Sequence, residues 1–460
     1  MSAALRDLRV GVGWRPEIAG ALLEDRARVD FVEVVAETCF IPTSTRREVM
    51  AVAEVWPVIP HGVKLSLGSA EGIDVERAKK LGALARDLKA PCVTEHVSFV
   101  RAGGHEVGHL TQLPRTRAAV EVVARNVDLA RRHLGDVPLV LENVAWTVRW
   151  PDDEMSEADF YAEVVARTGC DLMLDVSNLH ANAINEGLDP RACLRAFPLE
   201  RVVMAHMAGG RRVAPDFFLD SHADPVPEAV FTLLADLASL RGAVPVILER
   251  DADFPHWREL AAELDRARAL TLSVASAPVT PPVAPAPPVD LDLAPFAAAQ
   301  SALAASITEP PESTAPPPPG FDPAAVARTR ELLQRKRVDD ALPLLPRLMA
   351  RRSEAEAAAL PAVCAAPRAP RHNALTDAWR IATALTTHPP LGPAARLDAL
   401  VLRARTRALT VDGVAVRAPR DTPFVGRVAL PGGGSVWALK SLGSTAAVRV
   451  VYRGGGGARG

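Results

Sequence analysis

The sequence has few cysteines and no long apolar run, and both absences exclude classes of protein. Only five of its 460 residues are cysteines, none in a CxxC pair: Cys39, Cys92, Cys170, Cys193 and Cys364. This argues against a disulfide framework or a zinc ribbon, and we expect buried, reduced thiols. No apolar run approaches the ~18 residues needed to cross a bilayer, so no membrane partner is expected.

Two further patterns are missing near the N-terminus. The start, MSAALRDLRVGVGW, lacks the basic-then-apolar pattern of a signal peptide, so a cytoplasmic location is expected. Gly11 and Gly13 are followed by Trp14, Arg15 and Pro16. A dinucleotide-binding loop needs a third glycine and a helix start at this point. A doubly wound dinucleotide-binding sheet is therefore disfavoured.

Charge is distributed unevenly along the chain. Residues 321–460 contain 22 Lys and Arg against 10 Asp and Glu, a balance of +12, whereas residues 1–320 contain 31 against 45, a balance of −14. Opposite signs in the two parts predict separate domains. Residues 276–320 are rich in Pro and Ala, which predicts an extended linker. We therefore predict a first domain (1–275), a linker (276–320) and a basic tail domain (321–460).

The first 270 residues alternate short apolar runs with amphipathic stretches. Stretches such as VERAKKLGALARDL and RAAVEVVARNVDLARRHL have the i, i+3, i+4 and i+7 apolar spacing of helices. Eight strand–helix units in this length predict an α/β fold, a (β/α)8 barrel of the TIM type. The predicted strands are residues 9–13, 30–35, 63–67, 92–99, 138–144, 171–176, 201–207 and 244–250.

Polar side chains that can bind metal occur in or just after most of these runs. The carboxyl ends of barrel strands meet at one mouth, so residues far apart in sequence can bind one cation there. Seven such occurrences within 190 residues predict a polynuclear metal site at this mouth. The candidate ligands are His61, His96, Glu142, Asp175, Asn178, His206, Asp220, His222 and Glu249.

The donor atoms of these candidates restrict the metal. Imidazole nitrogens and carboxylate oxygens, without a thiolate at ligand spacing, suit Fe(II), Mn or Zn better than Mg or Ca. The set is too large for one ion, so we expect two or three ions, with a carboxylate such as Glu142 as a bridge. We predict no catalytic residue apart from the ligands, no organic cofactor and no nucleic-acid partner.

Eight ordered motifs give the chain a resemblance to a known family. They are HGVKLSLGS, EHVSF, QLPRT, LENVAW, LDVSN with a further Asn, HMAG, DSHADPVPEAVF and ILERD, between about Leu8 and Ala269. In this order they resemble the DUF692 (UPF0276) family. That family includes the multinuclear non-heme iron-dependent oxidative enzymes that modify ribosomally made peptides. The resemblance does not extend to the linker or the tail domain.

The resemblance implies a triosephosphate-isomerase-type barrel with two or three iron ions, as Fe(II) and Fe(III), and O2 as co-substrate. It also implies oxidation of cysteine residues in a precursor peptide, with a partner protein that binds the leader. Carried over residue by residue, one iron would be bound by Glu142, Asp175, His206 and Glu249. His61 and His96 would bind a second iron, bridged by Glu142, and Asn178, Asp220 and His222 would serve a third or variable site.

The sequence departs from the family pattern at three places. The family usually has Asn where Ser177 stands, an aromatic residue where His180 stands, and AGH where this chain has Ala208, Gly209 and Gly210. The absent His is suited to a place behind the ligands or next to the substrate. The departures therefore bear on the particular reaction more than on the metal core.

Two other classes of function use the same residue types. A metal-dependent isomerase or endonuclease on a xylose-isomerase-like barrel also places Glu, Asp and His at strand ends, and it would hold Mn or Zn rather than iron. A non-catalytic metal-binding scaffold is the third class. Fold alone does not choose among them.

The tail domain contains no recognisable chemical motif. Two helices are predicted within FDPAAVARTRELLQRKRVDDALPLLPRLMARR, two more in ALTDAWRIATAL and ARLDALVLRARTRAL, and short strands from Val411 onward. Its positive charge suits an acidic partner. We therefore predict that it recognises the peptide or a partner, in place of a separate leader-binding protein. The alternative is an Arg-rich composition without a binding role.

Overall fold

The structure is a computed structural model. It describes residues 5, 7–40, 44–215, 217–278, 281, 283–309, 313–365, 374–387, 393–411, 414–420, 422–429, 434–441 and 448–454. The chain divides into two units. The barrel unit comprises residues 1–103 and 110–300, and the tail unit comprises residues 104–109 and 301–460.

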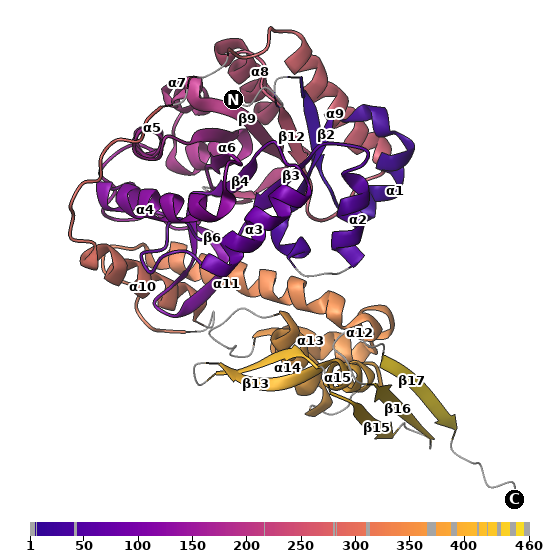
Figure 1. The fold of residues 1–460 in the computed structure, drawn as a ribbon. Helices are drawn as coiled ribbons and strands as arrows, with labels where there is room; N and C mark the ends of the chain where they lie inside the picture. The colour runs from indigo at the N-terminus through magenta and orange to yellow at the C-terminus, as the bar shows by residue number, and fades with distance from the viewer. Residues whose placement is uncertain are drawn as a thin grey trace, which may run out of the picture. The chain divides into compact units, whose positions relative to one another are not determined.

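Eight strands of the barrel unit close into a barrel, in the order β1-β12-β9-β8-β7-β4-β3-β2 (Figure 1). Neighbouring strands are parallel throughout. The strands are β1 (Val10–Gly13), β2 (Phe31–Val35), β3 (Val58–Gly62), β4 (Val93–His96), β7 (Leu139–Glu142), β8 (Asp171–Asp175), β9 (Val202–Ala208) and β12 (Val246–Glu249). The predicted (β/α)8 barrel is confirmed.

Helices alternate with these strands along the chain. They are α1 (Pro16–Glu24), α2 (Ser44–Val52), α3 (Val75–Asp87), α4 (Arg117–Leu134), α5 (Glu157–Thr168), α6 (Val176–Glu186), α7 (Pro190–Ala196), α8 (Glu228–Arg241) and α9 (Trp257–Leu272). Capping side chains define several starts: Asp74 accepts backbone N–H groups at the start of α3, and Ser156 does so at α5. Gly169 ends α5 in the left-handed conformation that favours glycine.

The third strand lies five residues before its predicted position. β3 is Val58–Gly62, and the predicted segment 63–67 forms bends and a turn. The prediction was wrong for two reasons. Pro60 lacks an N–H group and argues against a strand, whereas the alternation in VKLSL reflects two side chains, Leu65 and Leu67, that are buried from a loop. As a consequence, His61 lies within the end of β3.

The barrel interior changes from apolar to polar within two residues on each of seven strands. Successive side chains of a strand alternate sides, so residues two apart face the same way. An apolar core cluster includes the first member of each pair, and a polar residue follows nearer the carboxyl end. The pairs are Phe31 and Glu33, Ile59 and His61, Cys92 and Thr94 (then His96), Val140 and Glu142, Met173 and Asp175, Met204 and His206, and Ile247 and Glu249.

Two additional two-stranded sheets follow barrel strands. β5 (Ser98–Ala102) and β6 (His105–Gln112) follow β4, and the antiparallel pair β10 (Gly210–Ala214) and β11 (Phe217–Asp220) follows β9. Asn185 of α6 holds the second pair, because its Nδ2 donates to the Phe218 carbonyl at 3.0 Å and its Oδ1 accepts the Phe218 N–H at 2.6 Å. This contact positions Asp220 at the end of β11.

The Pro/Ala-rich segment contains no helix or strand over residues 283–293. Its backbone nevertheless packs on the end of α5 within the barrel unit, since the Ala286 N–H donates to the Ala166 carbonyl at 2.9 Å. Helix α10 (Ala294–Thr308) follows. Gln300 on this helix donates from Nε2 to the Gly68 carbonyl at 2.9 Å, so part of the segment is fastened to the barrel.

The tail unit is mostly helical and ends in short strands, as predicted. Its helices are α11 (Pro323–Ala341), α12 (Pro346–Arg351), α13 (Glu354–Ala365), α14 (Ala374–Thr387) and α15 (Pro393–Arg405). The strands are the pair β13 (Thr406–Val411) and β14 (Val414–Pro419), and the sheet β15 (Phe424–Ala429), β16 (Gly434–Lys440) and β17 (Val448–Gly454). Among the described residues, no helix is both long and apolar enough to cross a bilayer.

Candidate metal centre

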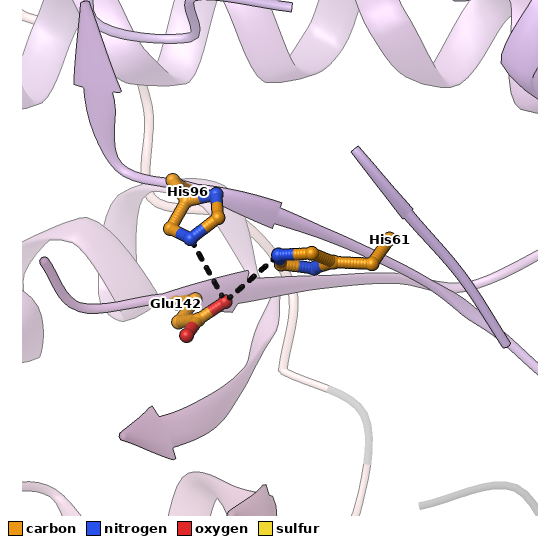
Figure 2. A group of neighbouring side chains, drawn as sticks. All are labelled: His61, His96 and Glu142. Atoms are coloured by element: carbon orange, nitrogen blue, oxygen red, sulfur yellow. Dashed lines mark ion pairs between the residues drawn. The ribbon is translucent and has the colours of Figure 1, made fainter. Parts of the chain in front are cut away.

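Three groups of potential metal ligands occur at the carboxyl ends of the barrel strands. His61, His96 and Glu142 form the first, and in Figure 2 both imidazole rings point toward one Glu142 oxygen. His61 Nε2 lies 3.7 Å and His96 Nε2 3.3 Å from Glu142 Oε2. Each Nδ1 has another partner: Thr94 Oγ1 at 2.8 Å from His61, and the Gly62 carbonyl at 3.3 Å from His96. Both rings therefore present Nε2 to one point, as metal-binding imidazoles do.

The second group consists of Glu142, Asp175 and His206, all fully buried. His206 lies between two carboxylates, with Nδ1 2.9 Å from Glu142 Oε1 and Nε2 3.1 Å from Glu33 Oε2. Glu142 thus belongs to both the first and the second group.

Asp175 is fixed by the helix that follows it. Its Oδ1 accepts the backbone N–H groups of Ser177 at 2.6 Å and Asn178 at 2.9 Å, which caps the start of α6. The cap explains why an Asp–x–Ser–Asn run follows a buried strand. Only Oδ2 remains available for another partner.

His222, Glu249 and Asp251 form the third group. His222 Nδ1 lies 3.2 Å from Glu249 Oε2 and 3.6 Å from Asp251 Oδ2, and its Nε2 lies 2.6 Å from Asp220 Oδ2. Arg15 contacts Glu249 Oε1 at 3.2 Å. His222 has a φ of +51°, which is uncommon for a residue other than glycine and is found in constrained functional loops.

Four oxygens in this region are buried and accept no hydrogen bond from the described residues, although the His61 and His96 rings approach the first of them. They are Glu142 Oε2, Asp175 Oδ2, Asn178 Oδ1 and Asp220 Oδ1. A buried oxygen without a donor costs free energy, on the order of 1–3 kcal/mol and more for a charged group. All four are oxygens of the kind that bind hard or borderline cations. The residues present therefore fit a cluster of metal ions.

The side chains of the centre shift one another's pKa. Burial raises the pKa of Glu142, but the imidazoles of His206, His96 and His61 outweigh it and lower the pKa to about 2. Burial lowers the pKa of His96, yet Glu142 and the other carboxylates raise it to about 9. Burial, together with repulsion by Asp220 and Glu142, raises the pKa of Asp175 to about 7. A cation would relieve that repulsion.

The structure brings the nine predicted site residues into one region. His61, His96, Glu142, Asp175, His206, His222 and Glu249 fall within the three groups. The other two lie beside them: Asp220 contacts His222, and the Asn178 N–H donates to Asp175. The side chain of Asn178 also donates from Nδ2 to the Asn143 carbonyl at 3.0 Å.

Two carboxylates near the centre were missed by the sequence analysis. Glu33 is 2 % exposed on β2 and contacts His206, and Asp251 follows Glu249 by two residues. Glu33 could have been found, because DFVEVV places it within an apolar run in the same way as Glu142 in LVLE. Asp251 carries no such pattern, since it lies in the loop after β12.

The described cysteines lie outside the three groups. Cys39, Cys92, Cys170 and Cys193 are free thiols, and the Cys364 side chain lies outside the described residues. Burial raises the pKa of Cys92 to about 12 and that of Cys170 to about 11. These thiols are therefore held protonated, which disfavours them as ligands.

The departures from the family pattern have a packing explanation. The Ser177 hydroxyl contacts the N–H and the carbonyl of Ala208 at 2.7 and 3.0 Å, which ties α6 to the end of β9. A Cβ on Gly210 would lie 2.5 Å from the Phe218 ring. That ring also packs edge-on against His180, at 5.2 Å between centroids. The space beside position 210 is thus occupied by Phe218. The Nδ1 atom of His180 is buried and has no hydrogen-bond partner among the described residues.

The fold and these groups define a (β/α)8-barrel protein with a candidate multinuclear metal centre at its mouth. The sequence model for the RiPP precursor modification enzyme family MbnB/TglH/ChrH matches residues 9–272, more than half of the chain. The chain belongs to this family of enzymes, and the resemblance to DUF692 (UPF0276) is confirmed.

Similar proteins include two UPF0276 proteins. One from Streptomyces avermitilis is 44% identical over 274 residues, and the match covers 57% of this chain but only 55% of that protein. One from Caulobacter vibrioides (strain NA1000 / CB15N) is 39% identical over 261 residues, and the match covers 56% of this chain and 92% of that protein.

Solved structures with a similar chain path include a xylose isomerase domain protein from Planctomyces limnophilus. It has a TM-score of 0.40 and 17% identity, and the match covers 58% of this chain and 98% of that one. Endonuclease IV from Thermus thermophilus has a TM-score of 0.38 and 20% identity, and the match covers 58% of this chain and 99% of that one.

Proposed function

We propose that this chain is a multinuclear non-heme iron oxidase that uses O2 to modify cysteine residues of a ribosomally synthesised precursor peptide. One observation carries the proposal: three groups of His and carboxylate side chains lie at the barrel mouth, and Glu142 belongs to two of them. One ion needs fewer ligands than these groups contain, and a carboxylate with two oxygens is suited to bridge two ions.

The proposed ligand assignment follows the family pattern. One ion would be bound by Glu142, Asp175, His206 and Glu249, and a second by His61, His96 and Glu142. Asn178, Asp220 and His222 would serve a third ion.

The distances support one refinement of this assignment. Glu249 Oε2 lies 3.2 Å from His222 Nδ1 and 3.6 Å from His206 Nδ1, which supports a role for Glu249 in binding both the first and the third ion. Asp251 would join the third ion, because its Oδ2 lies 3.6 Å from His222 Nδ1.

Neighbouring residues would hold the ligands in position. Glu33 accepts from His206 Nε2, which leaves Nδ1 directed to the centre, and Arg15 holds one oxygen of Glu249. Thr94 contacts Nδ1 of His61, which leaves Nε2 of His61 directed to the centre. Such contacts fix the tautomer and orientation of a metal ligand. They also leave the ligands little freedom to rearrange when substrate enters.

Iron, when bound, would supply the redox capacity and would lower the pKa of a substrate thiol that binds it. O2 is the oxidant, so a four-electron oxidation of a cysteine residue is balanced by reduction of one O2 to two water molecules. The chain's part is to orient the thiol within a buried centre and to exclude bulk water from it.

Metal analysis tests the proposal directly. Protein purified without O2 and reconstituted with Fe(II) should contain two to three iron ions per chain. It should also consume O2 in the presence of a cysteine-containing peptide encoded beside this chain. Bound zinc or manganese, with iron reconstitution failing, would favour an isomerase or endonuclease instead. Iron binding without O2 uptake in the presence of that peptide would favour a scaffold.

Two substitutions test the ligand assignment. His61→Ala and His96→Ala should each remove one iron population from the Mössbauer spectrum and leave the other ions in place. His256→Ala is the matched control, because His256 is exposed and lies outside the three groups. An unchanged iron spectrum in the first two variants would remove these histidines from the site.

A further inference from the structure

The tail unit ends in a sheet whose last strand has an open side. Among the described strands, β17 pairs only with β16, in the antiparallel register that places Val451 opposite Trp437 and Val450 opposite Ala438. An edge strand presents a row of backbone N–H and C=O groups that can pair with another extended chain.

Two core-facing side chains of β17 are exposed, whereas a third, Val448, packs against the core of the sheet. Val450 lies opposite Ala438 and Tyr452 opposite Val436, and residues opposite each other point to the same face. Ala438 and Val436 are buried in a core with Leu400 of α15. By contrast, Val450 is 44% exposed and Tyr452 is 64% exposed. The apolar face of the sheet therefore continues onto β17, where α15 packs near Val448 but leaves Val450 and Tyr452 exposed. Exposed apolar side chains that continue a core are candidates for an interaction site.

The segment that forms this sheet carries charge of one sign. Residues 422–460 contain five Lys and Arg and no Asp or Glu. Arg449 is exposed on β17 itself, and Arg427 is exposed on β15, where its guanidinium lies 5.6 Å from the Trp437 ring centre. A partner that carries carboxylates is complementary to this sheet.

We propose that the open edge of β17 binds an acidic, extended segment of the precursor peptide by strand addition. The segment would pair with the β17 backbone and place alternate apolar side chains over Val450 and Tyr452, with carboxylates near Arg449. Main-chain pairing gives such a contact its affinity, and the alternate side chains give it specificity. This inference rests on the proposed function, because it takes the substrate to be a peptide.

A second copy of this chain fits the edge less well. Pairing of two β17 strands would bring two copies of the basic sequence VRVVYRG together, and like charges opposite each other in a sheet are destabilising. The edge is thus suited to an acidic strand rather than to itself.

Fluorescence anisotropy with defined peptides tests the inference. The probe is a labelled synthetic peptide that alternates Val or Thr with Glu and Asp, compared with the same peptide carrying Lys and with polyglutamate. The full chain should bind the acidic alternating peptide at least about tenfold more tightly than either of the others, a difference of about 1.4 kcal/mol. Val450→Thr, Tyr452→Ser and Arg449→Glu should each weaken that binding.

A matched control distinguishes binding at the β17 edge from nonspecific binding to exposed apolar side chains. Val425 is 66% exposed on β15, the opposite edge, so Val425→Thr should leave the affinity unchanged. Circular dichroism checks that all variants remain folded.

Equal binding of polyglutamate, preference for a single-stranded oligonucleotide, or a dimer that Tyr452→Ser abolishes would each overturn the inference. Binding is measured without O2 or turnover, so its failure is distinguishable from failure of the proposed iron oxidase.

Discussion

Both units bury carboxylates, but they differ in how those carboxylates are satisfied. In the tail unit, both oxygens of Asp377 accept from the Arg337 guanidinium, at 2.8 and 2.9 Å. Asp398 accepts the backbone N–H groups of Arg347 and Leu348. Each of these charges is neutralised or hydrogen-bonded by the chain itself.

At the barrel mouth, the chain does not supply a hydrogen bond or ion pair to every buried carboxylate oxygen. Glu142, Asp175 and Asp220 each leave one buried oxygen without a donor among the described residues, although polar side chains surround them. Buried polar atoms are normally satisfied, so an oxygen that is not requires an explanation such as an ion. The comparison indicates that the tail carboxylates stabilise the fold, whereas those of the barrel mouth serve a ligand. The two kinds of carboxylate should therefore respond differently to substitution.

The largest effect is expected at Glu142 and His206. Glu142→Ala and His206→Ala should remove iron and abolish activity, because Glu142 is shared by two groups and His206 belongs to one of them. The metal-free barrel should remain folded, since its apolar layer lies two residues away on seven of the eight strands. Elemental analysis and circular dichroism measure both outcomes. Full iron content and turnover in Glu142→Ala would break the comparison.

The opposite response is expected in the tail. Asp377→Ala leaves the buried Arg337 charge without its partner, which costs roughly 3–5 kcal/mol. Iron content should not change. Denaturant unfolding measures the loss, and the double variant Arg337→Met with Asp377→Leu should recover much of it, because neither charge then remains buried. Loss of iron in Asp377→Ala would show that the two regions are not independent.

A smaller effect is expected from Glu33, which contacts His206 from behind. Glu33→Gln keeps an acceptor but removes the charge, and loss of such an outer contact typically lowers metal affinity about 10–100-fold. Competition with a chelator measures the change. Glu48→Gln is the control, because Glu48 accepts from Trp14 Nε1 at 3.0 Å outside the centre. Equal affinities in the two variants would count against an orienting role.

The smallest effect concerns Glu157, a third kind of carboxyl. Burial raises the pKa of this group from 4.5 to about 7, with one hydrogen bond from Asn182 Nδ2 at 3.0 Å. A carboxyl with a raised folded pKa stabilises the fold below its unfolded pKa, and that contribution is lost as pH rises through about 7. Stability should therefore fall between about pH 5 and pH 8. Glu157→Gln should remove the part of this dependence that Glu157 contributes and raise Tm at the higher pH by a few degrees. If the unchanged protein and Glu157→Gln differ in Tm by the same amount at pH 5 and at pH 8, this prediction is wrong.

The sequence by itself determined the barrel and the types of ligand. Strands buried in a parallel barrel are short apolar runs, and an Asp, Glu or His at the end of such a run is visible in local order. Asp175, His206 and Glu249 were recognisable for this reason. The third strand was misplaced because Pro60 hides its pattern and the buried loop residues Leu65 and Leu67 imitate a strand.

Only the tertiary structure decided which of these residues meet. His96 lies level with Glu142 and Asp175 with His206 because β4 pairs with β7 and β8 with β9 in those registers. The same geometry brings Glu33 from β2 to His206 and places Glu249 between His206 and His222. Spacing along the chain does not encode such neighbours, because closing the barrel and choosing a register depend on the packing of all eight strands at once.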